Sequence, residues 1–318
     1  MLEWDRPLVL REGQNDVVTV GELLVDLISA EYGDTHESEA YHKYFGGSPA
    51  NIAMNVRKLG GQSQLVAAVG NDGLGQYLLR QLRKGDIDPL FVETVDQATS
   101  LVLLTKSRST PVPIFYRSAD YQIGFGPKQE QLLRQSKLLH FSCWPVSRTP
   151  ARTAIESMIA AAKSHGVRIG FDPNYHPMLW PKDEDGTSFV KSLIGMADIV
   201  KPSDDDAERL FGPDSPENQV EKFLGLGAGL VILTMGKEGA LVSNGTEIVR
   251  FPTLASEVAD TTGAGDAFWS GFYTGLIKEH TLREAISLGF AVSAYKLKFT
   301  GAVVDLPALD KIRALYGL

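Results

Sequence analysis

The chain has 318 residues, 43% of them hydrophobic and 22% charged, which is enough for a substantial core in one large or two modest domains. Its net charge of -8 comes without clusters of Lys and Arg, so no general attraction to nucleic acid or to an anionic membrane is expected. The single cysteine, Cys143, excludes an internal disulfide, and no run of eighteen apolar residues predicts a membrane span. Residues 1–16 have neither a signal-peptide nor a targeting-helix pattern, so we expect a cytoplasmic protein.

Short apolar runs alternate with amphipathic stretches of helical length along most of the chain. Residues 17–28 predict a first buried strand, and residues 48–61 predict a helix with Ser48 as its N-cap and Pro49 in its first turn. The same cycle recurs with strands predicted at 64–70, 138–142, 167–172, 197–202 and 229–236 and helices predicted at 73–85 and 149–165. This alternation is typical of a mainly parallel sheet covered by helices.

Two stretches break the alternation. Residues 34–45 and 98–123 are extended in pattern and rich in aromatic residues and Thr, with a Pro-interrupted turn at 110–113. They predict a small separate sheet, and ordinary edge strands of the main sheet are the alternative. The expected division is therefore an α/β core of residues 16–33, 46–97 and 124–318, with the small sheet made of 34–45 and 98–123.

Two glycine patterns that often bind phosphates do not apply to this chain. The stretch "GLGAGL" at 225–230 resembles a dinucleotide fingerprint, but a helical pattern precedes it and a strand follows, which is the reverse of the required order. It predicts a turn between helix and strand. A Walker A pattern is absent from the sequence, so a P-loop enzyme is not expected.

The stretch "DTTGAGDAF" at 260–268 opens a predicted helix. Glycines in the first turn of a helix leave its N–H groups and positive dipole end open to a phosphate or a developing anion. An acid beside such a site, here Asp266, suits phosphoryl transfer if it accepts the proton of the attacking hydroxyl. The alternative is a tight turn followed by an acid favoured by the helix dipole. Behind it runs a small-residue stripe for close helix packing, formed by Ala267, Gly271 and Gly275.

A second group of residues suits a polyol. Gly46 and Gly47 precede a predicted helix that carries Asn51 in its first turns, and Asp26 is a lone carboxylate in an apolar strand. Carboxylates and amides pair well with hydroxyl groups of neutral sugars. The alternatives are a solvent-exposed acid at a strand end for Asp26 and a helix-capping role for Asn51.

The segments "GGSPAN" at 46–51 and "DTTGAGDAF", about 210 residues apart, together resemble the two signatures of the ribokinase or PfkB family of sugar kinases. The resemblance extends from about residue 16 to residue 307. It implies a ribokinase-like, doubly wound α/β domain with a small β-sheet lid. It also implies an enzyme that uses ATP and Mg²⁺.

The resemblance implies a role for each matching residue. Asp266 is expected to be the catalytic base, and the N–H groups that stabilise the phosphoryl are those of Gly263, Ala264 and Gly265. The residues implied to hold the sugar are Asp26, Gly46, Gly47 and Asn51, with Tyr116 and Arg117 reaching it from the lid. In "LTMGKEG" at 233–239, the residues similar to nucleotide contacts are Thr234, Gly236 and Gly239. Asp260 falls where some members bind K⁺. Tyr116 and Arg117 have the alternative of a dimer contact or a plain surface position.

One segment departs from the family pattern. Where the family has Asn-x-x-Glu after Lys-Pro, this chain reads "KPSDDDAE", with Ser203 and Asp206 at those positions. Ser203 is then expected near the nucleotide, and Asp206 would reach Mg²⁺ through a water molecule. The alternative is a solvated helix start with Ser203 as the N-cap.

Within the family, "GELLVD", "FYRSAD" and "DPNYHPMLW" look most like fructokinase segments. His176 stands where related ketodeoxygluconate kinases often have an Arg for the substrate carboxylate, which favours a neutral sugar. We therefore expect phosphorylation of D-fructose to fructose 6-phosphate. The alternatives are a 2-keto-3-deoxygluconate kinase, a ribokinase or another family kinase, and, from a different class, a non-catalytic sugar-binding protein. A homodimer through the lid is expected from its apolar and aromatic residues, which include Tyr41, Tyr44, Phe45 and residues 101–104.

Overall fold

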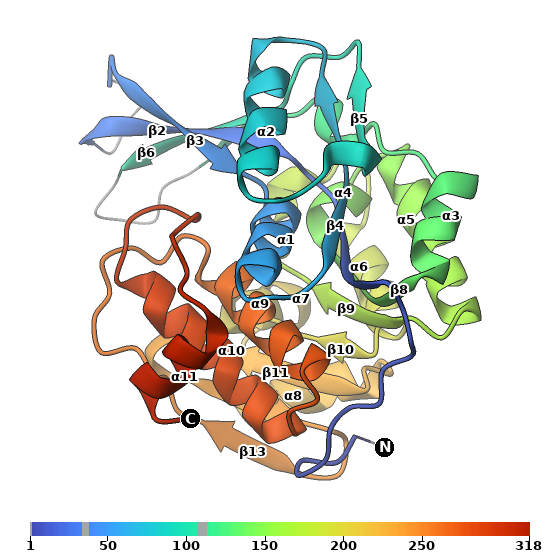
Figure 1. Cartoon of the computed structure of the whole chain (residues 1–318), viewed down its shortest axis with the longest axis vertical. Helices are drawn as coiled ribbons and strands as arrows, with labels where there is room; N and C mark the ends of the chain where they lie inside the picture. Colours follow the sequence, from blue (N-terminus) through green and yellow to red (C-terminus); the bar gives the residue numbers. More distant parts are fainter. Residues whose placement is uncertain (1, 34–37, 107–112) are drawn as a thin grey trace.

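The computed structural model describes residues 2–33, 38–106 and 113–318. Within them, nine strands form the main sheet in the order β13-β12-β11-β10-β9-β8-β1-β4-β5 (Figure 1). Their bounds are β1 Asn15–Val20, β4 Ser63–Gly70, β5 Val92–Val95, β8 Ser136–Ser142, β9 Arg168–Asp172, β10 Ile199–Val200, β11 Leu230–Thr234, β12 Ala240–Ser243 and β13 Ile248–Phe251. All neighbours from β11 to β5 are parallel, whereas β12 pairs antiparallel with both β11 and β13. The predicted mainly parallel sheet is confirmed.

Helices cover both faces of this sheet because its strands are apolar on both sides. In β1, Val17 packs with the cluster that includes Trp269, whereas Val18 packs with the cluster that includes Ile155. The first face carries α1 Ser48–Lys58, α2 Gly73–Lys84, α9 Ala264–Ile277 and α10 Leu282–Leu297, and the second carries α3 Pro127–Arg134, α5 Ala151–Ser164, α6 Gly186–Ile194, α7 Asp204–Phe211 and α8 Pro216–Gly225. The short α4 Cys143–Val146 follows β8, and α11 Leu309–Tyr316 packs on α10. As predicted, the residues between α8 and β11 form a turn.

A second, four-stranded sheet projects from one side of the body (Figure 1). Its order is β3-β2-β6-β7, with bounds β2 Leu24–Tyr32, β3 Tyr41–Gly46, β6 Leu101–Lys106 and β7 Ile114–Tyr116. The predicted separate sheet is confirmed for these residues. Residues 34–37 and most of the expected turn at 110–113 lie outside the described residues, and residues 119–121 form a 3-10 turn rather than a strand.

The prediction of one strand over residues 17–28 is wrong. The chain leaves the main sheet after Val20, turns at Gly21, which has a φ of +151°, and enters the small sheet at Leu24. Residues 24–32 therefore belong to the small sheet and not to the core as expected. Apolar residues on both sides of Gly21 and Glu22 hid this boundary, since both strands bury the same kinds of side chain.

Close packing of α9 on α10 depends on the small stripe of α9. A methyl group on Gly271 would lie 2.6 Å from the Leu288 carbonyl oxygen and 2.7 Å from Val292 Cγ2. We expect Gly271→Ala to lower the free energy of unfolding by about 1–3 kcal/mol, as overpacked cores do, measured by urea denaturation. Gly73→Ala, where a methyl group meets no atom within 4 Å, is the matched control and should leave stability equal or slightly higher. Equal stability of Gly271→Ala and the parent would contradict the packing argument.

Candidate active site

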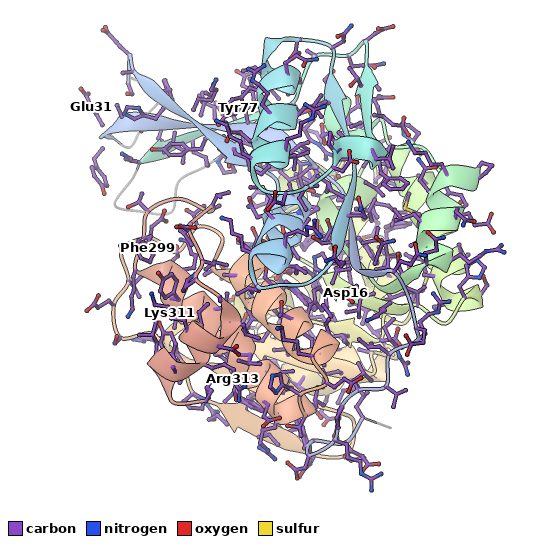
Figure 2. All side chains as sticks on the ribbon, viewed as in Figure 1. Asp16, Glu31, Tyr77, Phe299, Lys311 and Arg313 are labelled. Carbon is purple, nitrogen blue, oxygen red and sulfur yellow. The ribbon has the colours of Figure 1, made fainter. Side chains whose placement is uncertain are left out.

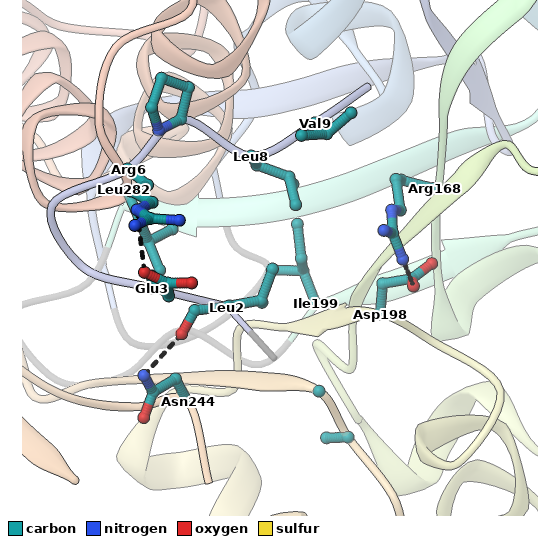
Figure 3. A pocket seen from close by; sticks show the side chains of 13 residues that line it. Leu2, Glu3, Arg6, Leu8, Val9, Arg168, Asp198, Ile199, Asn244 and Leu282 are labelled. Atoms are coloured by element: carbon teal, nitrogen blue, oxygen red, sulfur yellow. Dashed lines mark hydrogen bonds and ion pairs between the residues drawn. The ribbon is translucent and has the colours of Figure 1, made fainter. Parts of the chain in front are cut away.

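Several of the predicted site residues lie at the carboxyl end of the parallel strand β11 and beside the N-terminus of α9. This is where ligands bind in open α/β sheets. A cavity of about 440 Å³ there is lined by several of them, including Thr234, Gly236, Gly239, Ala264 and Gly265. Another cavity, of about 620 Å³, lies beneath the N-terminal segment and contains the Arg168–Asp198 ion pair (Figure 3). None of the predicted site residues lines that second cavity, so we place the candidate site at the first.

Asp266 joins the two sequence motifs. It lies in the first turn of α9, whose N-cap Gly263 has a left-handed φ of +75°. Its Oδ1 accepts a hydrogen bond from Ser48 Oγ at 2.6 Å, and its Oδ2 accepts one from Asn51 Nδ2 at 2.9 Å. The start of α1 therefore meets the start of α9, although Asn51 and Asp266 are 215 residues apart in the chain.

Ser48 is not the N-cap of its helix, which corrects the sequence prediction. Gly47 occupies the cap with a φ of +110°, and a Cβ there would collide with the carbonyl oxygen of Glu22. The Ser48 hydroxyl is thereby free to donate to Asp266 instead. Sequence reasoning missed Ser48 as a site residue because a Ser before a Pro looks like an ordinary cap.

On the side of α1 and β2, the surroundings of Asp266 are rich in side-chain oxygen atoms that can form hydrogen bonds. Asp26 on β2 lies against Gly46, where any Cβ would collide with its carboxylate. Burial, with the nearby charge of Asp266, raises the pKa of Asp26 to about 7, and burial raises the pKa of Glu22 to about 8. Among the described residues, Glu22 Oε2 and Asn51 Oδ1 are buried without a hydrogen-bond partner. Unpartnered polar atoms of this kind fit the hydroxyl groups of a polyol, which can both donate and accept hydrogen bonds.

The environment of Asp266 suits a proton acceptor. Burial, together with the charge of Asp172, raises the pKa of Asp266, while the hydrogen bonds from Ser48 and Asn51 and the charge of Lys201 act in the opposite direction. The net effect is a rise. A carboxylate with a raised pKa takes up a proton more readily than an ordinary one, which is what a general base requires.

Lys201 brings a buried positive charge to the anion site, and sequence reasoning did not select it. Its Nζ lies 3.1 Å from Asp172 Oδ2, which also accepts a hydrogen bond from Trp269 Nε1 at 2.7 Å. A Cβ on Gly265 would lie 3.6 Å from the same Nζ, so the ammonium stands beside the first turn of α9. The Lys-Pro pair at the end of a strand was the available signal.

Of the three N–H groups expected to stabilise the phosphoryl, one is engaged by an acceptor within the protein. The N–H of Ala264 donates to the Thr261 carbonyl at 3.1 Å. Among the described residues, the N–H groups of Gly263 and Gly265 have no acceptor. The left-handed φ of Gly263, and the 2.9 Å that would separate its Cβ from Ala302 Cα, explain why glycine is needed there.

Ser203 and Asp206 form a helix cap rather than an open metal site. The Ser203 hydroxyl accepts from the Asp206 N–H, and Asp206 Oδ2 accepts from the Ser203 N–H and hydroxyl. The other oxygen, Oδ1, accepts from the Tyr175 N–H at 2.6 Å. Asp206 is buried, unlike the solvated start expected as the alternative, while Ser203 as N-cap is confirmed. Both carboxylate oxygens of the proposed magnesium ligand are thus engaged within the protein.

Arg117 and Tyr116 are not brought to the site by direct contacts. The Arg117 guanidinium forms a buried ion pair with Asp120 at 2.8 Å and donates to Ser147 Oγ at 2.6 Å. Tyr116 is 56% exposed on the edge strand β7. Arg117 therefore stabilises the junction between β7 and α4, which is neither of the alternatives weighed from the sequence.

The described residues contain no group of three His, Cys, Asp or Glu side chains arranged to hold a metal ion. Asp260, the expected potassium ligand, has its carboxylate engaged by Thr262 and Gly301. Among the described residues, no helix is long and apolar enough to span a bilayer.

The buried carboxyl of Glu22 predicts a pH dependence of stability. Its pKa is raised from 4.5 to about 8, so its stabilising contribution is complete below pH 4.5 and is lost as the pH rises through about 8. We expect the free energy of unfolding to fall from about pH 5 to about pH 8, and to fall less in Glu22→Gln, by an amount on the order of a few kcal/mol. Urea denaturation at several pH values measures this. The control is Glu31→Gln at the exposed tip of the small sheet (Figure 2), and an unchanged slope in Glu22→Gln would refute the assignment.

A glycine-lined helix start, a buried carboxyl with a raised pKa and a pocket at the strand ends are features that suit a small-molecule phosphotransferase on a doubly wound α/β fold. Comparison with known proteins gives the family. The model of the pfkB family carbohydrate kinases matches residues 14–309. The chain therefore belongs to the PfkB family of carbohydrate kinases and is an enzyme of that class.

Individual relatives agree with this assignment. The chain is 56% identical over 318 residues to an ATP-dependent 6-phosphofructokinase of Thermoanaerobacterium thermosaccharolyticum, covering all of this chain and 99% of the relative. The structure of Halothermothrix orenii fructokinase is 42% identical with a TM-score of 0.79, covering 86% and 97% of the two chains. An uncharacterized Pyrococcus horikoshii sugar kinase in complex with ATP is 29% identical with a TM-score of 0.81, covering 94% and 97%. The similarity to the two solved structures shows the ribokinase-like fold, which in this chain consists of the large mainly parallel sheet and the small second sheet.

Proposed function

We propose that this protein is an ATP-dependent kinase that transfers the γ-phosphoryl group to D-fructose and forms fructose 6-phosphate. The observation that carries the proposal is the position of Asp266, between a region of carboxylate and amide oxygens and a cavity lined by the glycines of two loops. The ATP-bound Pyrococcus relative supports the choice of nucleotide.

In this proposal each residue has a defined part in the reaction. Asp26, Glu22 and Asn51 bind sugar hydroxyls, and Asp266 takes the proton of the attacking hydroxyl. The sugar oxygen forms a bond to the γ-phosphorus while the bond from that phosphorus to the β–γ bridging oxygen breaks, so ADP leaves and the proton stays on Asp266. The N–H groups of Gly263 and Gly265 and the Lys201 ammonium stabilise the charge of the transferring group.

Mg²⁺ would accompany the ATP phosphates and neutralise part of their charge. The hydrogen bonds that engage both oxygens of Asp206 leave direct coordination by that residue unfavourable. Contact between the chain and the ion would then run through water, as the sequence suggested for this position.

A neutral acceptor is supported by the charges around the site. The guanidinium of Arg117 is already paired with Asp120. Burial and the charge of Arg209 lower the pKa of His176, so its ring is uncharged near neutral pH. Asp26, whose pKa is about 7, is ionised in part near neutral pH and would then repel an anionic acceptor.

A second candidate acceptor is fructose 6-phosphate. It is favoured by the name of the Thermoanaerobacterium relative, whose 56% identity extends over the whole chain. Phosphorylation would then occur at a different hydroxyl of the same sugar skeleton and give a bisphosphate.

Measurement of ADP release with a panel of acceptors separates these candidates. The panel holds fructose, fructose 6-phosphate, ribose, 2-keto-3-deoxygluconate and a nucleoside, each with the protein and Mg-ATP. The proposal predicts that kcat/KM is highest for fructose, with the product phosphorylated at carbon 6 by ³¹P NMR. A higher value for fructose 6-phosphate selects the second candidate, and no ADP release with any acceptor rejects turnover and leaves a sugar-binding protein.

The small sheet is proposed to act as a lid and as a dimer contact. Tyr32 and Tyr116 are 73% and 56% exposed on it, which supports a covering partner, whereas Phe45 is buried within the protomer. Closure over the sugar would exclude water and limit ATP hydrolysis. Light scattering that gives the mass of one chain at assay concentration would count against the dimer.

A further inference from the structure

The surroundings of Asp260 do not fit a bound potassium ion. Asp260 Oδ1 accepts from the Thr262 N–H at 2.9 Å and from the Thr262 hydroxyl at 2.8 Å, and Oδ2 accepts from the Gly301 N–H at 2.7 Å. Although burial opposes it, these hydrogen bonds lower the pKa of the Asp260 carboxyl, so it is ionised. Its main-chain carbonyl oxygen accepts from Lys296 Nζ at 2.7 Å. The main-chain oxygen of the expected potassium ligand therefore already accepts a hydrogen bond from a cationic side chain of the protein, Lys296.

Lys296 is an unusual residue to find at this place. It lies in the last turn of α10 and is fully buried, among the largest buried side chains of the protein. Burying an ammonium is unfavourable unless it is paired and hydrogen-bonded. Burial lowers the pKa of Lys296, and the negative charges of Asp260 and Asp266 oppose that shift. Lys296 therefore donates to the main chain of Asp260, while the carboxylates of Asp260 and Asp266 favour its charged form.

The segment tied by Lys296 leads directly into the anion site. The Ala259 N–H donates to the Leu297 carbonyl at 2.8 Å, next to the bond from Lys296 to Asp260. Three residues after Asp260 comes Gly263, the N-cap of α9, which lies tightly against Ala302. Residues 259–263 are thus held on one side by the end of α10 and by the loop that follows, which contains Phe299, labelled in Figure 2.

We propose that the Lys296 ammonium serves as a built-in cation, which holds residues 259–263 in place and makes a monovalent metal ion unnecessary. The fixed positive charge of Lys296 lies behind the N–H groups of Gly263 and Gly265 and adds to the positive potential with which they bind the phosphoryl group. Lys296 itself does not contact the substrate. Lys296 is in this sense a positioning residue. The inference rests on the kinase family and not on the identity of the sugar.

The first test uses the unmodified protein. Affinity for ADP, by calorimetry, and turnover of the best acceptor are measured in tetramethylammonium chloride and in KCl at the same concentration, about 100 mM, so that screening is equal. Both quantities are expected to agree within about twofold, a difference below the 1.4 kcal/mol of a tenfold change. A tenfold or greater gain on adding K⁺ in either quantity would overturn the proposal. The ADP affinity remains informative even if the proposed acceptor is wrong.

The second test removes the charge. Lys296→Met should lower kcat and ADP affinity by about tenfold, less than loss of a direct oxyanion donor, with no recovery in KCl. Lys296→Ala leaves room for an ion, so K⁺ or a small alkylammonium should restore part of the loss. The matched control is Lys298→Met, an exposed lysine two residues along, which should behave like the parent. Full activity of folded Lys296→Met without K⁺ would overturn the proposal, and if neither variant folds, the measurements on the unmodified protein decide it.

Discussion

Asp266→Asn is expected to lower kcat by about 10³-fold, within the 10²–10⁴-fold range of general acid–base catalysis, while both substrates still bind. The amide keeps the shape of the side chain and a hydrogen-bonding oxygen, but it cannot accept the proton of the attacking hydroxyl. Steady-state kinetics with the preferred acceptor, together with calorimetry for sugar and nucleotide, measures the two effects separately.

The control for this variant is Asp204→Asn, an exposed carboxylate at the start of α7, which should be indistinguishable from the parent. A value of kcat in Asp266→Asn within tenfold of the parent would remove Asp266 from the role of base. Loss of sugar binding in place of turnover would instead assign it to substrate binding alone.

Lys201→Met is expected to reduce both turnover and stability. Removing one partner of a buried ion pair leaves the Asp172 carboxylate uncompensated, which costs about 3–5 kcal/mol of unfolding free energy. Loss of a cation beside the transferring phosphoryl should lower kcat by about 10²–10³-fold. Urea denaturation and steady-state kinetics measure the two losses.

The double variant Lys201→Met with Asp172→Asn separates the two effects. The Asn oxygen can still accept from Trp269 Nε1, and no unpaired charge remains, so much of the stability should return while turnover stays low. Lys311→Met, on the exposed face of α11 (Figure 2), is the matched control for removing a lysine. If turnover returns together with stability, Lys201 acts only in folding.

The layered architecture was predictable because local patterns carry it. Apolar runs alternate with amphipathic helices along most of the chain, and the small stripe of α9 correctly indicated a closely packed neighbour, which is α10. The boundary at Gly21 was not predictable, since hydrophobicity is the same on both sides of it. The only sign of this positive φ in the sequence is the glycine itself, and glycines also occur at many positions that are not strand boundaries.

The candidate site was predictable where a residue's role depends on its own motif. The N-cap position of Gly263 and the first-turn position of Asp266 follow from "TGAGD" as a helix start. The roles of Ser48, Lys201 and Lys296 depend instead on partners far away in the chain, such as Asp266 or Asp260. Nothing in the local sequence distinguishes a buried lysine of this kind from a solvated one. Ser203 and Asp206 are the opposite case, because a purely local role, the capping of α7, accounts for their geometry.

The hydrogen bonds that Ser48 and Asn51 donate to Asp266 also have a consequence for folding. They join segments 218 and 215 residues apart, so they close one of the longest loops in the chain. Contacts of such sequence separation carry a high entropic cost and slow the formation of the structure that needs them. Neither α1 nor α9 alone contains Asp266 together with its two donors. The carboxylate that we propose as the base therefore acquires both of its donors only when the early and late parts of the chain have both been made and packed.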